Sequence, residues 1–149
     1  MARILLGVTG GIAAYKACTL VRLLVKAGHD VLPVLTASAE RFVTEETFFA
    51  LARKSPQGPY PHLERADLLV IAPLTANTLA RLAHGLADDV LTEAALAHEG
   101  HVLVAPAMNV RMWEHPATQA NAALLRERGV EILGPAEGEL AEGEVGAGR

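Results

Sequence analysis

A short segment in the second half of the chain carries its densest group of chemically distinctive side chains. It follows an apolar run at 101–105 that is typical of a buried strand. It supplies one amide, two thioethers and the only tryptophan: Asn109, Met108, Met112 and Trp113. An amide donates and accepts hydrogen bonds, and thioethers and an indole offer soft, flat surface to a planar or sulfur-containing ligand. Core packing is the plainer interpretation of methionine and tryptophan, and these residues alone leave both open.

Small and hydroxylic residues gather after the first two predicted strands. Gly10 and Gly11 follow the first strand, and Thr36 and Ser38 follow the second. Backbone amides at a glycine turn before a helix can approach a phosphate, and hydroxyl groups add further donors. The glycines do not form a dinucleotide fingerprint, and Thr36 stands where an NAD-binding chain places an acidic ribose ligand. The pattern favours a mononucleotide, although glycine also serves tight turns for geometry alone.

Short apolar segments alternate with amphipathic helical segments along the chain. The predicted strands are 3–8, 30–35, 67–72, 101–105 and 130–133. Apolar strands separated by helices pair in parallel and are covered on both faces, so we expect a doubly wound, mostly parallel α/β fold. Ligands bind beyond the carboxyl ends of such strands, where Thr75, Asn77 and Asn109 join the residues named above.

The first predicted helix has an apolar stripe with its basic residues on the other side. The stripe consists of Ala13, Ala17, Leu20, Leu24 and Ala27, and the residues facing away are Lys16, Arg22 and Lys26. Gly28 ends this helix, whereas Thr44, the pair Asp88 and Asp89, and Pro116 are typical of helix starts. Cys18 lies in the middle of the first helix, where packing is the expected role.

Composition excludes several classes of function. The 149 residues fit one domain, and no apolar run reaches the eighteen residues needed to cross a bilayer. The start of the chain lacks a signal-peptide pattern, so we expect a cytoplasmic protein. A net charge of −4 argues against a nucleic-acid partner. The single cysteine cannot form an internal disulfide, and no Cys/His spacing indicates a metal site.

Five motifs spread over the chain carry a resemblance to a known family. Residues 106–113 read P-A-M-N-V-R-M-W, which resembles the substrate-recognition signature of the homo-oligomeric flavin-containing cysteine decarboxylases. Residues 8–16, V-T-G-G-I-A-A-Y-K, are similar to the family's opening. Residues 35–42, 67–77 and 85–92 match its T-x-x-A-x-x-F, D-L-x-V-I-A-P-x-T-A-N and G-x-A-D-D-x-L-T elements. The pattern is most similar to the phosphopantothenoylcysteine decarboxylases of coenzyme A synthesis.

The resemblance implies a Rossmann-like flavoprotein that binds FMN. It places the FMN phosphate near Gly10, Gly11, Thr36 and Ser38. The remaining cofactor contacts that it implies are Phe42, Pro73, Thr75, Asn77, Ala107 and Met108. It further implies a flavin-binding domain at 1–134 and a substrate-covering tail, rich in glycine and glutamate, at 135–149.

The implied reaction is an oxidative decarboxylation of the cysteine moiety of 4'-phospho-N-pantothenoylcysteine, giving 4'-phosphopantetheine. By the resemblance, His62 is the active-site base and Asn109 orients the substrate carboxylate. The family's tail carries a cysteine as proton donor, and Glu142 occupies that position here. Two alternatives therefore stay open: a flavin-binding regulatory or partner subunit without full turnover, and a decarboxylase of peptide C-terminal cysteine that stops at the enethiol.

The resemblance also implies a homo-oligomer, either a trimer or a dodecamer, that acts on a small phosphorylated thiol. A set of bulky apolar residues is consistent with this, because it exceeds what a thin layer of helices hides. The set comprises Phe42, Phe48, Phe49, Met112 and Trp113.

Overall fold

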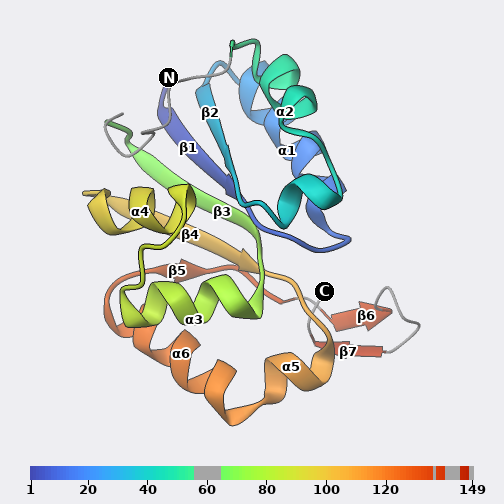
Figure 1. Ribbon diagram of the computed structural model, residues 1–149, viewed down its shortest axis with the longest axis vertical. Coiled ribbons are helices and arrows are strands. Elements are labelled where there is room, and N and C mark those ends of the chain that lie inside the picture. Colours follow the sequence, from blue (N-terminus) through green and yellow to red (C-terminus); the bar gives the residue numbers. More distant parts are fainter. Residues whose placement is uncertain (56–64, 136, 140–144, 148–149) are drawn as a thin grey trace.

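A sheet of five parallel strands forms the centre of the computed structural model, which describes residues 1–55, 65–135, 137–139 and 145–147 (Figure 1). The strand order is β2-β1-β3-β4-β5. The strands are β1 (Arg3–Val8), β2 (Asp30–Leu35), β3 (Leu68–Leu74), β4 (His101–Pro106) and β5 (Glu131–Ile132). All five predicted strands are present, with bounds within two residues. The doubly wound parallel fold expected from the sequence is confirmed.

Helices cover both faces of the sheet (Figure 1). On one side lies α1 (Ala14–Lys26), with α2 (Glu45–Ala52) and the short 3-10 helix η1 (Ala39–Arg41) near the β2 edge. On the other side lie α3 (Ala76–His84), α4 (Val90–Ala97) and α6 (Pro116–Glu127). The five-residue helix α5 (Val110–Glu114) directly follows the turn after β4. Because the strands are parallel, the turn that follows each strand lies at the same edge of the sheet.

Two apolar clusters fill the space between the sheet and its helices, and both correct expectations from the sequence. Phe48 and Phe49 are buried within this single chain, at 0% and 5% exposure, so they need no partner subunit to cover them. On α1 the buried residues are Ala14, Ala17 and Val21, so the predicted Ala17 is confirmed, the predicted Leu20 and Leu24 are partly buried against the core, and the predicted Ala27 is exposed. Ala14 and Val21 share the side of the helix that Ala17 occupies, because positions three and four apart on a helix are neighbours.

The helix starts follow the expected capping chemistry, with one correction. The Thr44 hydroxyl accepts a hydrogen bond from the Thr47 amide at the start of α2, and Pro116 is the first residue of α6. At α4 the cap is Asp89, which exchanges hydrogen bonds with Thr92 in a capping box. Asp88, its neighbour in the predicted pair, instead forms an ion pair with Arg81.

The tail forms a small two-stranded antiparallel sheet that its composition did not predict. β6 (Glu137–Glu139) pairs with β7 (Val145–Ala147), and β7 lies against α5. Backbone hydrogen bonds need no apolar periodicity, so a Gly- and Glu-rich segment can pair without showing a strand pattern. The tail thus approaches the segment that contains Asn109.

An ion-pair network ties the amino-terminal ends of the strands together. The Arg3 guanidinium donates to the Asp30 carboxylate at 3.3 Å, and Lys54 forms a second ion pair with the same carboxylate. The Asp67 carboxylate accepts from the Arg3 backbone amide at 2.8 Å. The hydrogen bond from Lys54, with support from Arg3, holds the pKa of the Asp30 carboxyl below its usual range.

Stability should depend on Asp30 only where its carboxyl is ionised. We expect Asp30→Asn to lower the free energy of unfolding by about 0.5–1 kcal/mol at pH 7, because the ion pairs are partly exposed. A depressed pKa adds stability that is complete above the unfolded value of about 3.9 and is lost as the pH falls through the folded value. Urea unfolding of the parent and of the variant at pH 7 and at pH 3 measures how much stability Asp30 contributes at each pH. An equal difference between parent and variant at both pH values would contradict this role.

Candidate functional site

The turns after β1 and β3 are joined by a buried hydroxyl. Thr9 is 1% exposed, and its Oγ1 donates to the Pro73 carbonyl at 2.6 Å and accepts from the Thr75 amide at 2.9 Å. The Thr75 hydroxyl in turn caps α3 by accepting from the Thr78 amide. Thr9 therefore fixes two residues of the predicted flavin set, Pro73 and Thr75, against the loop that holds Gly10. Sequence reasoning missed this role, since a threonine at a strand end has no distinctive pattern.

Replacing Thr9 with valine should loosen this joint while keeping the side-chain shape. The Pro73 carbonyl and the Thr75 amide would lose a buried partner, which costs about 1–3 kcal/mol. Thr9→Ser is the matched control, because it keeps the hydroxyl and removes only a methyl group. Thermal and urea unfolding of the three proteins would measure the loss. If the valine variant were as stable as the serine variant, the hydroxyl would not hold the two turns.

Different structural features require glycine at positions 10 and 11. A Cβ on Gly10 would lie 2.5 Å from the Ser38 Cβ, so the loop after β1 can approach the loop after β2 only with glycine there. Gly11 has φ +132° and open space around its Cα, a backbone conformation that glycine adopts without strain. The structure thus places Gly10 against Ser38, and Gly11 follows Gly10 in the same loop.

The backbone amides of residues 10–13 form a row of donors at the start of α1. Within the described part of the chain none of these four amides has an acceptor, and Gly10 is buried. The N-cap residue Ala13 has no side-chain capping bond, and the first turn of α1 contains no acidic residue. Buried amides need partners, and consecutive amides at a helix start bind anions. This loop fits a phosphate group, which is the part of a flavin mononucleotide that the sequence placed here.

The two hydroxyls after β2 differ in accessibility. Thr36 is buried at 7% exposure, and its Oγ1 accepts from the Ala39 amide at 3.2 Å, so it stabilises the turn into η1. Ser38 is exposed and lies against Gly10. Phe42, at 49% exposure, lies just beyond η1. Of these residues, Ser38 has the hydroxyl that is best placed to contact a phosphate on the amide row.

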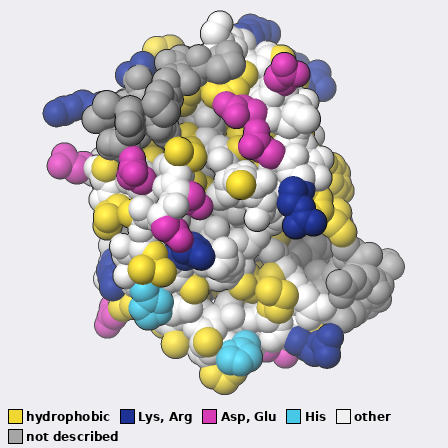
Figure 2. All heavy atoms as spheres, in the orientation of Figure 1, with side chains coloured by type: hydrophobic (Ala, Val, Ile, Leu, Met, Phe, Trp, Pro, Cys, Tyr) yellow, Lys and Arg dark blue, Asp and Glu magenta, His cyan; other side chains and the backbone are white. Residues whose placement is uncertain are grey.

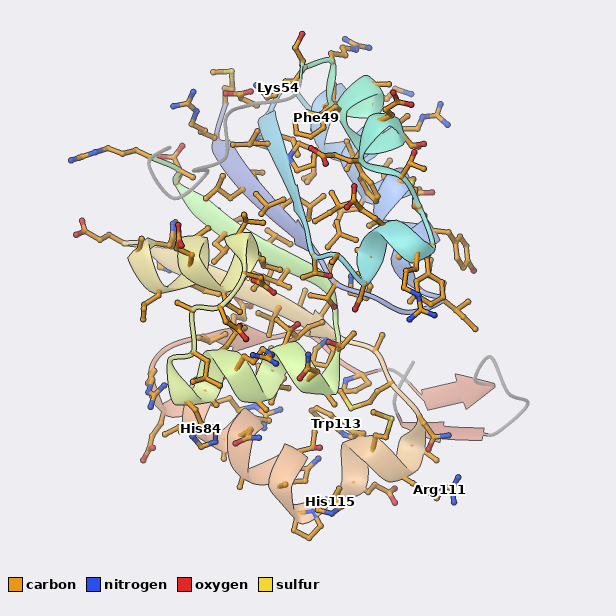
Figure 3. The ribbon with its side chains drawn as sticks, in the orientation of Figure 1. Phe49, Lys54, His84, Arg111, Trp113 and His115 are labelled. Carbon is orange, nitrogen blue, oxygen red and sulfur yellow. The ribbon has the colours of Figure 1, made fainter. Side chains whose placement is uncertain are left out.

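Asn109 begins α5 and uses part of its amide to do so. Its Oδ1 accepts from the Arg111 backbone amide at 2.8 Å. Met112 is 49% exposed, whereas Trp113 lies between α3 and α5 and packs against the buried core (Figure 3). Core packing is therefore the correct interpretation of Trp113. Arg111 extends away from the core on the far side of α5 (Figure 3).

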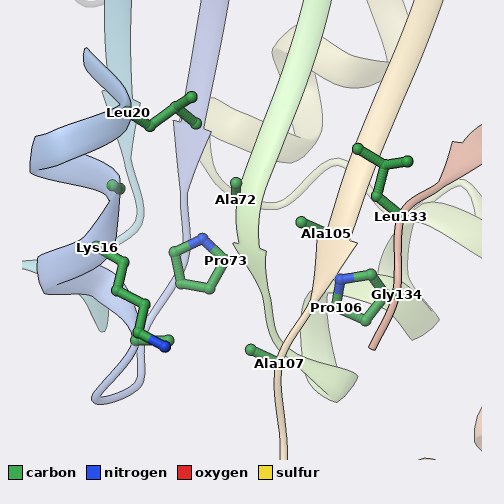
Figure 4. Close-up of a pocket in the computed structure, with 11 residues that line it drawn as sticks. Lys16, Leu20, Ala72, Pro73, Ala105, Pro106, Ala107, Leu133 and Gly134 are labelled. Carbon is green, nitrogen blue, oxygen red and sulfur yellow. The ribbon is translucent and has the colours of Figure 1, made fainter. Parts of the chain in front are cut away.

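An apolar cavity of about 440 Å³ opens between α1 and the ends of β3, β4 and β5 (Figure 4). Its lining includes two residues of the predicted flavin set, Pro73 and Ala107. The remaining lining residues are Ala13, Lys16, Ala17, Leu20, Ala72, Ala105, Pro106, Leu133 and Gly134. Lys16, which the helical pattern placed away from the apolar side of α1, is part of this wall. The cavity and the amide row are thus neighbours at one sheet edge.

The structure describes two of the remaining predicted site residues and leaves two undescribed. Met108 is partly buried, and Asn77 is exposed in the first turn of α3. His62 and Glu142 lie outside the residues that the structure describes. Two of the described histidines make local contacts: His84 with Asn121, and His115, between α5 and α6, with the Ala117 amide (Figure 3).

The rest of the described structure contains neither a metal-binding cluster nor a membrane-spanning helix. The face in Figure 2 carries acidic and basic side chains in small separate groups. Across the described residues, no cluster of His, Cys, Asp and Glu could hold a metal ion. None of the helices found there is both long enough and apolar enough to cross a membrane.

Comparison with known proteins places this geometry in a family. The family described as Flavoprotein matches residues 1–149, the whole chain. The chain belongs to the Flavoprotein family. The loop at 10–13, whose amides have no acceptor among the described residues, and the apolar wall beside it are therefore the candidate cofactor site of a Flavoprotein family member.

Two curated relatives of this Flavoprotein family chain are bifunctional proteins. The coenzyme A biosynthesis bifunctional protein CoaBC of Mycobacterium tuberculosis is 50% identical over 99% of this chain and 38% of its own length. CoaBC of Bacillus subtilis is 46% identical over 98% of this chain and 39% of its own length. The chain thus spans about two fifths of the curated relatives it matches.

Solved structures share the fold over nearly the whole chain. A PPC decarboxylase mutant complexed with pantothenoylaminoethenethiol has a TM-score of 0.85 and 34% identity, covering 98% of this chain and 88% of that one. The FMN binding protein AtHal3 has a TM-score of 0.82 and 33% identity, covering 99% and 88%. The Rossmann-like flavoprotein fold is thereby confirmed.

Proposed function

We propose that this chain is an FMN-dependent decarboxylase of 4'-phospho-N-pantothenoylcysteine that produces 4'-phosphopantetheine in coenzyme A biosynthesis. The main support is the row of unbonded amides at 10–13 beside the apolar wall of Pro73 and Ala107, in a chain that resembles a PPC decarboxylase along almost its full length. Neither feature alone selects a substrate, because one fold serves many activities.

Residues of the strand ends would hold FMN in this proposal. The amides of 10–13 and the Ser38 hydroxyl would bind its phosphate, and Pro73, Ala107 and Met108 would face its ring. Bound FMN supplies a two-electron oxidation of the substrate thiol carbon, which gives the neighbouring carboxylate an electron sink. The protein's part is to orient the substrate and to move its protons.

Two residues of the chain would act directly on the substrate. His62 would remove a proton, since a histidine with an ordinary pKa of about 6.5 is partly neutral at pH 7. The Asn109 Nδ2 group would donate to the departing carboxylate. The tail, 135–149, would cover the substrate, in keeping with the contact of β7 with α5.

The glutamate at position 142 favours an alternative in which the reaction stops before turnover is complete. A carboxylate is a poor proton donor near pH 7 unless its pKa is raised, so the reaction could stop at the enethiol. Structural neighbours that act as cysteine decarboxylases include the FMN-dependent TvaF from thioviridamide biosynthesis, with 29% identity and a TM-score of 0.83. A flavin-binding partner subunit without turnover is the other alternative.

Mass spectrometry of the products separates these functions. Incubated with 4'-phospho-N-pantothenoylcysteine, the full decarboxylase gives phosphopantetheine, and an enzyme that stops early gives an enethiol lighter by two hydrogens. Unchanged substrate would refute a decarboxylase. Glu142→Cys should convert an enethiol-forming parent into one that releases the saturated thiol. If the parent already makes that thiol and Glu142→Gln is equally fast, Glu142 is not the donor.

A homo-oligomer, a trimer or a dodecamer located in the cytoplasm, completes the proposal. Exposed apolar side chains flank the amide row: Ile12 at 59%, Tyr15 at 58% and Phe42 at 49%. Apolar side chains so close to a cofactor site are typical of a face covered by a second subunit. Light scattering should therefore give a mass of at least three times 15.7 kDa. A monomer that retains FMN would contradict this prediction.

A further inference from the structure

Among the residues that the structure describes, Lys16 is the only charged one that lines the apolar cavity. Every other lining residue is Ala, Leu, Pro or Gly. In Figure 4 its side chain extends from α1 toward the carboxyl ends of the strands, on the side where Pro73 and Ala107 lie. Its Nζ lies 6.0 Å from the centre of the Tyr15 ring. Lysine often lays its carbon stem along apolar surface with its ammonium in solvent, and here that surface is a cavity wall.

The local electrostatics around this ammonium favour an anion. Within the described residues Lys16 forms no ion pair. It is the third residue of α1, in a first turn that contains no acidic side chain. The partial positive charge at a helix start disfavours a cation there and favours an anion. An anion at the cavity mouth would interact favourably with both the ammonium and the helix start.

The size and walls of the cavity define the kind of anion. A volume of about 440 Å³ far exceeds that of a lone inorganic ion, and apolar walls favour carbon over water. The ligand that fits is an organic anion with an apolar chain. The proposed substrate carries anions at a carboxylate and a phosphate, and the chain between them contains a dimethyl-substituted carbon and methylene groups together with two amides and a hydroxyl.

We propose that Lys16 is a substrate-binding residue whose ammonium pairs with an anionic group of the substrate, while the carbon chain of the substrate lies along the α1 side of the cavity, across from the flavin ring at Pro73 and Ala107. This inference rests on the proposed function for the identity of the ligand. It adds a charge contact that neither the amide row nor Asn109 supplies. The shared chemistry is an oxygen anion, which the substrate offers at its carboxylate and at its phosphate.

The test compares Lys16→Gln, Lys16→Arg and the parent, with Lys26→Gln as a matched control. Lys26 is also on α1 and exposed, but it does not line the cavity. Calorimetry would measure Kd, and decarboxylation assays would measure KM and kcat, for 4'-phospho-N-pantothenoylcysteine and for its dephosphorylated form. Flavin absorbance and the melting temperature would report on the cofactor and the fold.

We expect Lys16→Gln to raise Kd and KM about 10- to 100-fold, the loss typical of a charged hydrogen bond, with a much smaller change in kcat. Lys16→Arg should recover most of the affinity, and Lys26→Gln should match the parent. A loss confined to the phosphorylated ligand identifies the phosphate as the partner, and an equal loss for both identifies the carboxylate.

Three results would overturn the inference: unchanged affinity in Lys16→Gln, an equal loss in Lys26→Gln, or loss of bound FMN or of melting temperature in Lys16→Gln. A parent that binds the ligand through Lys16 without converting it would refute the proposed function and leave the inference standing. A parent that binds neither ligand would overturn the inference.

Discussion

Replacing His62 with asparagine should abolish decarboxylation while the protein stays folded and retains its yellow colour. Asparagine keeps polarity and similar size but cannot accept a proton near neutral pH. General-base catalysis contributes roughly a hundredfold to ten-thousandfold to rate, so CO₂ release should fall by that factor. The assay follows CO₂ from 4'-phospho-N-pantothenoylcysteine, with flavin absorbance and circular dichroism recorded on the same samples.

A suitable control is His115→Asn, because the His115 ring nitrogen accepts from the Ala117 amide at the start of α6, a structural contact. This variant should keep the parental rate even if its stability falls. CO₂ release by His62→Asn at the parental rate would remove His62 from the mechanism. A melted spectrum in that variant would indicate a structural role instead.

Replacing Gly11 with aspartate should give a colourless protein. The new carboxylate would enter the row of amides at 10–13, where a phosphate is expected, and would repel it. At φ +132° any side chain is also strained, so some stability will be lost. Flavin content per chain, measured by absorbance after purification with excess FMN, gives the result.

Gly28→Asp separates the charge effect from the backbone effect. Gly28 also has a positive φ, +93°, with nothing near its Cα, and it follows the opposite end of α1. Both variants should lose comparable stability, and only Gly11→Asp should lose FMN. If the two variants bound FMN equally well, the amide row would not be the phosphate site.

The sequence predicted the sheet edge of the site well, because topology alone determines it. Parallel strands that alternate with helices must all end at one edge, so Gly10, Ser38, Thr75 and Ala107 converge whatever their side-chain packing. Motif spacing added the identity of the family. Neither depended on a contact between particular atoms.

The predictions failed where the role of a residue depends on a single contact or on how one side chain packs. Thr9 acquires its role from Pro73 and Thr75, which lie more than sixty positions later in the chain. Lys16 lines a cavity although the helical pattern placed it away from the apolar stripe, because a long side chain can lay its carbon stem along a neighbouring apolar wall. Phe48 and Phe49 are bulky enough to suggest an interface, yet the core of the single chain accommodates both.

The ion pairs of Asp30 lie at the opposite edge of the sheet from the amide row. This separation makes the electrostatics of the two regions independent of each other. β1 is six residues long, which at about 3.3 Å per residue places its ends roughly 20 Å apart. Charges at that distance are screened by physiological salt, whose Debye length is about 8 Å. Protonation of Asp30 can therefore weaken the fold without altering the local potential where the phosphate and the substrate would bind. Acid tolerance and ligand affinity can accordingly be tuned independently, by substitutions at opposite ends of the same strands.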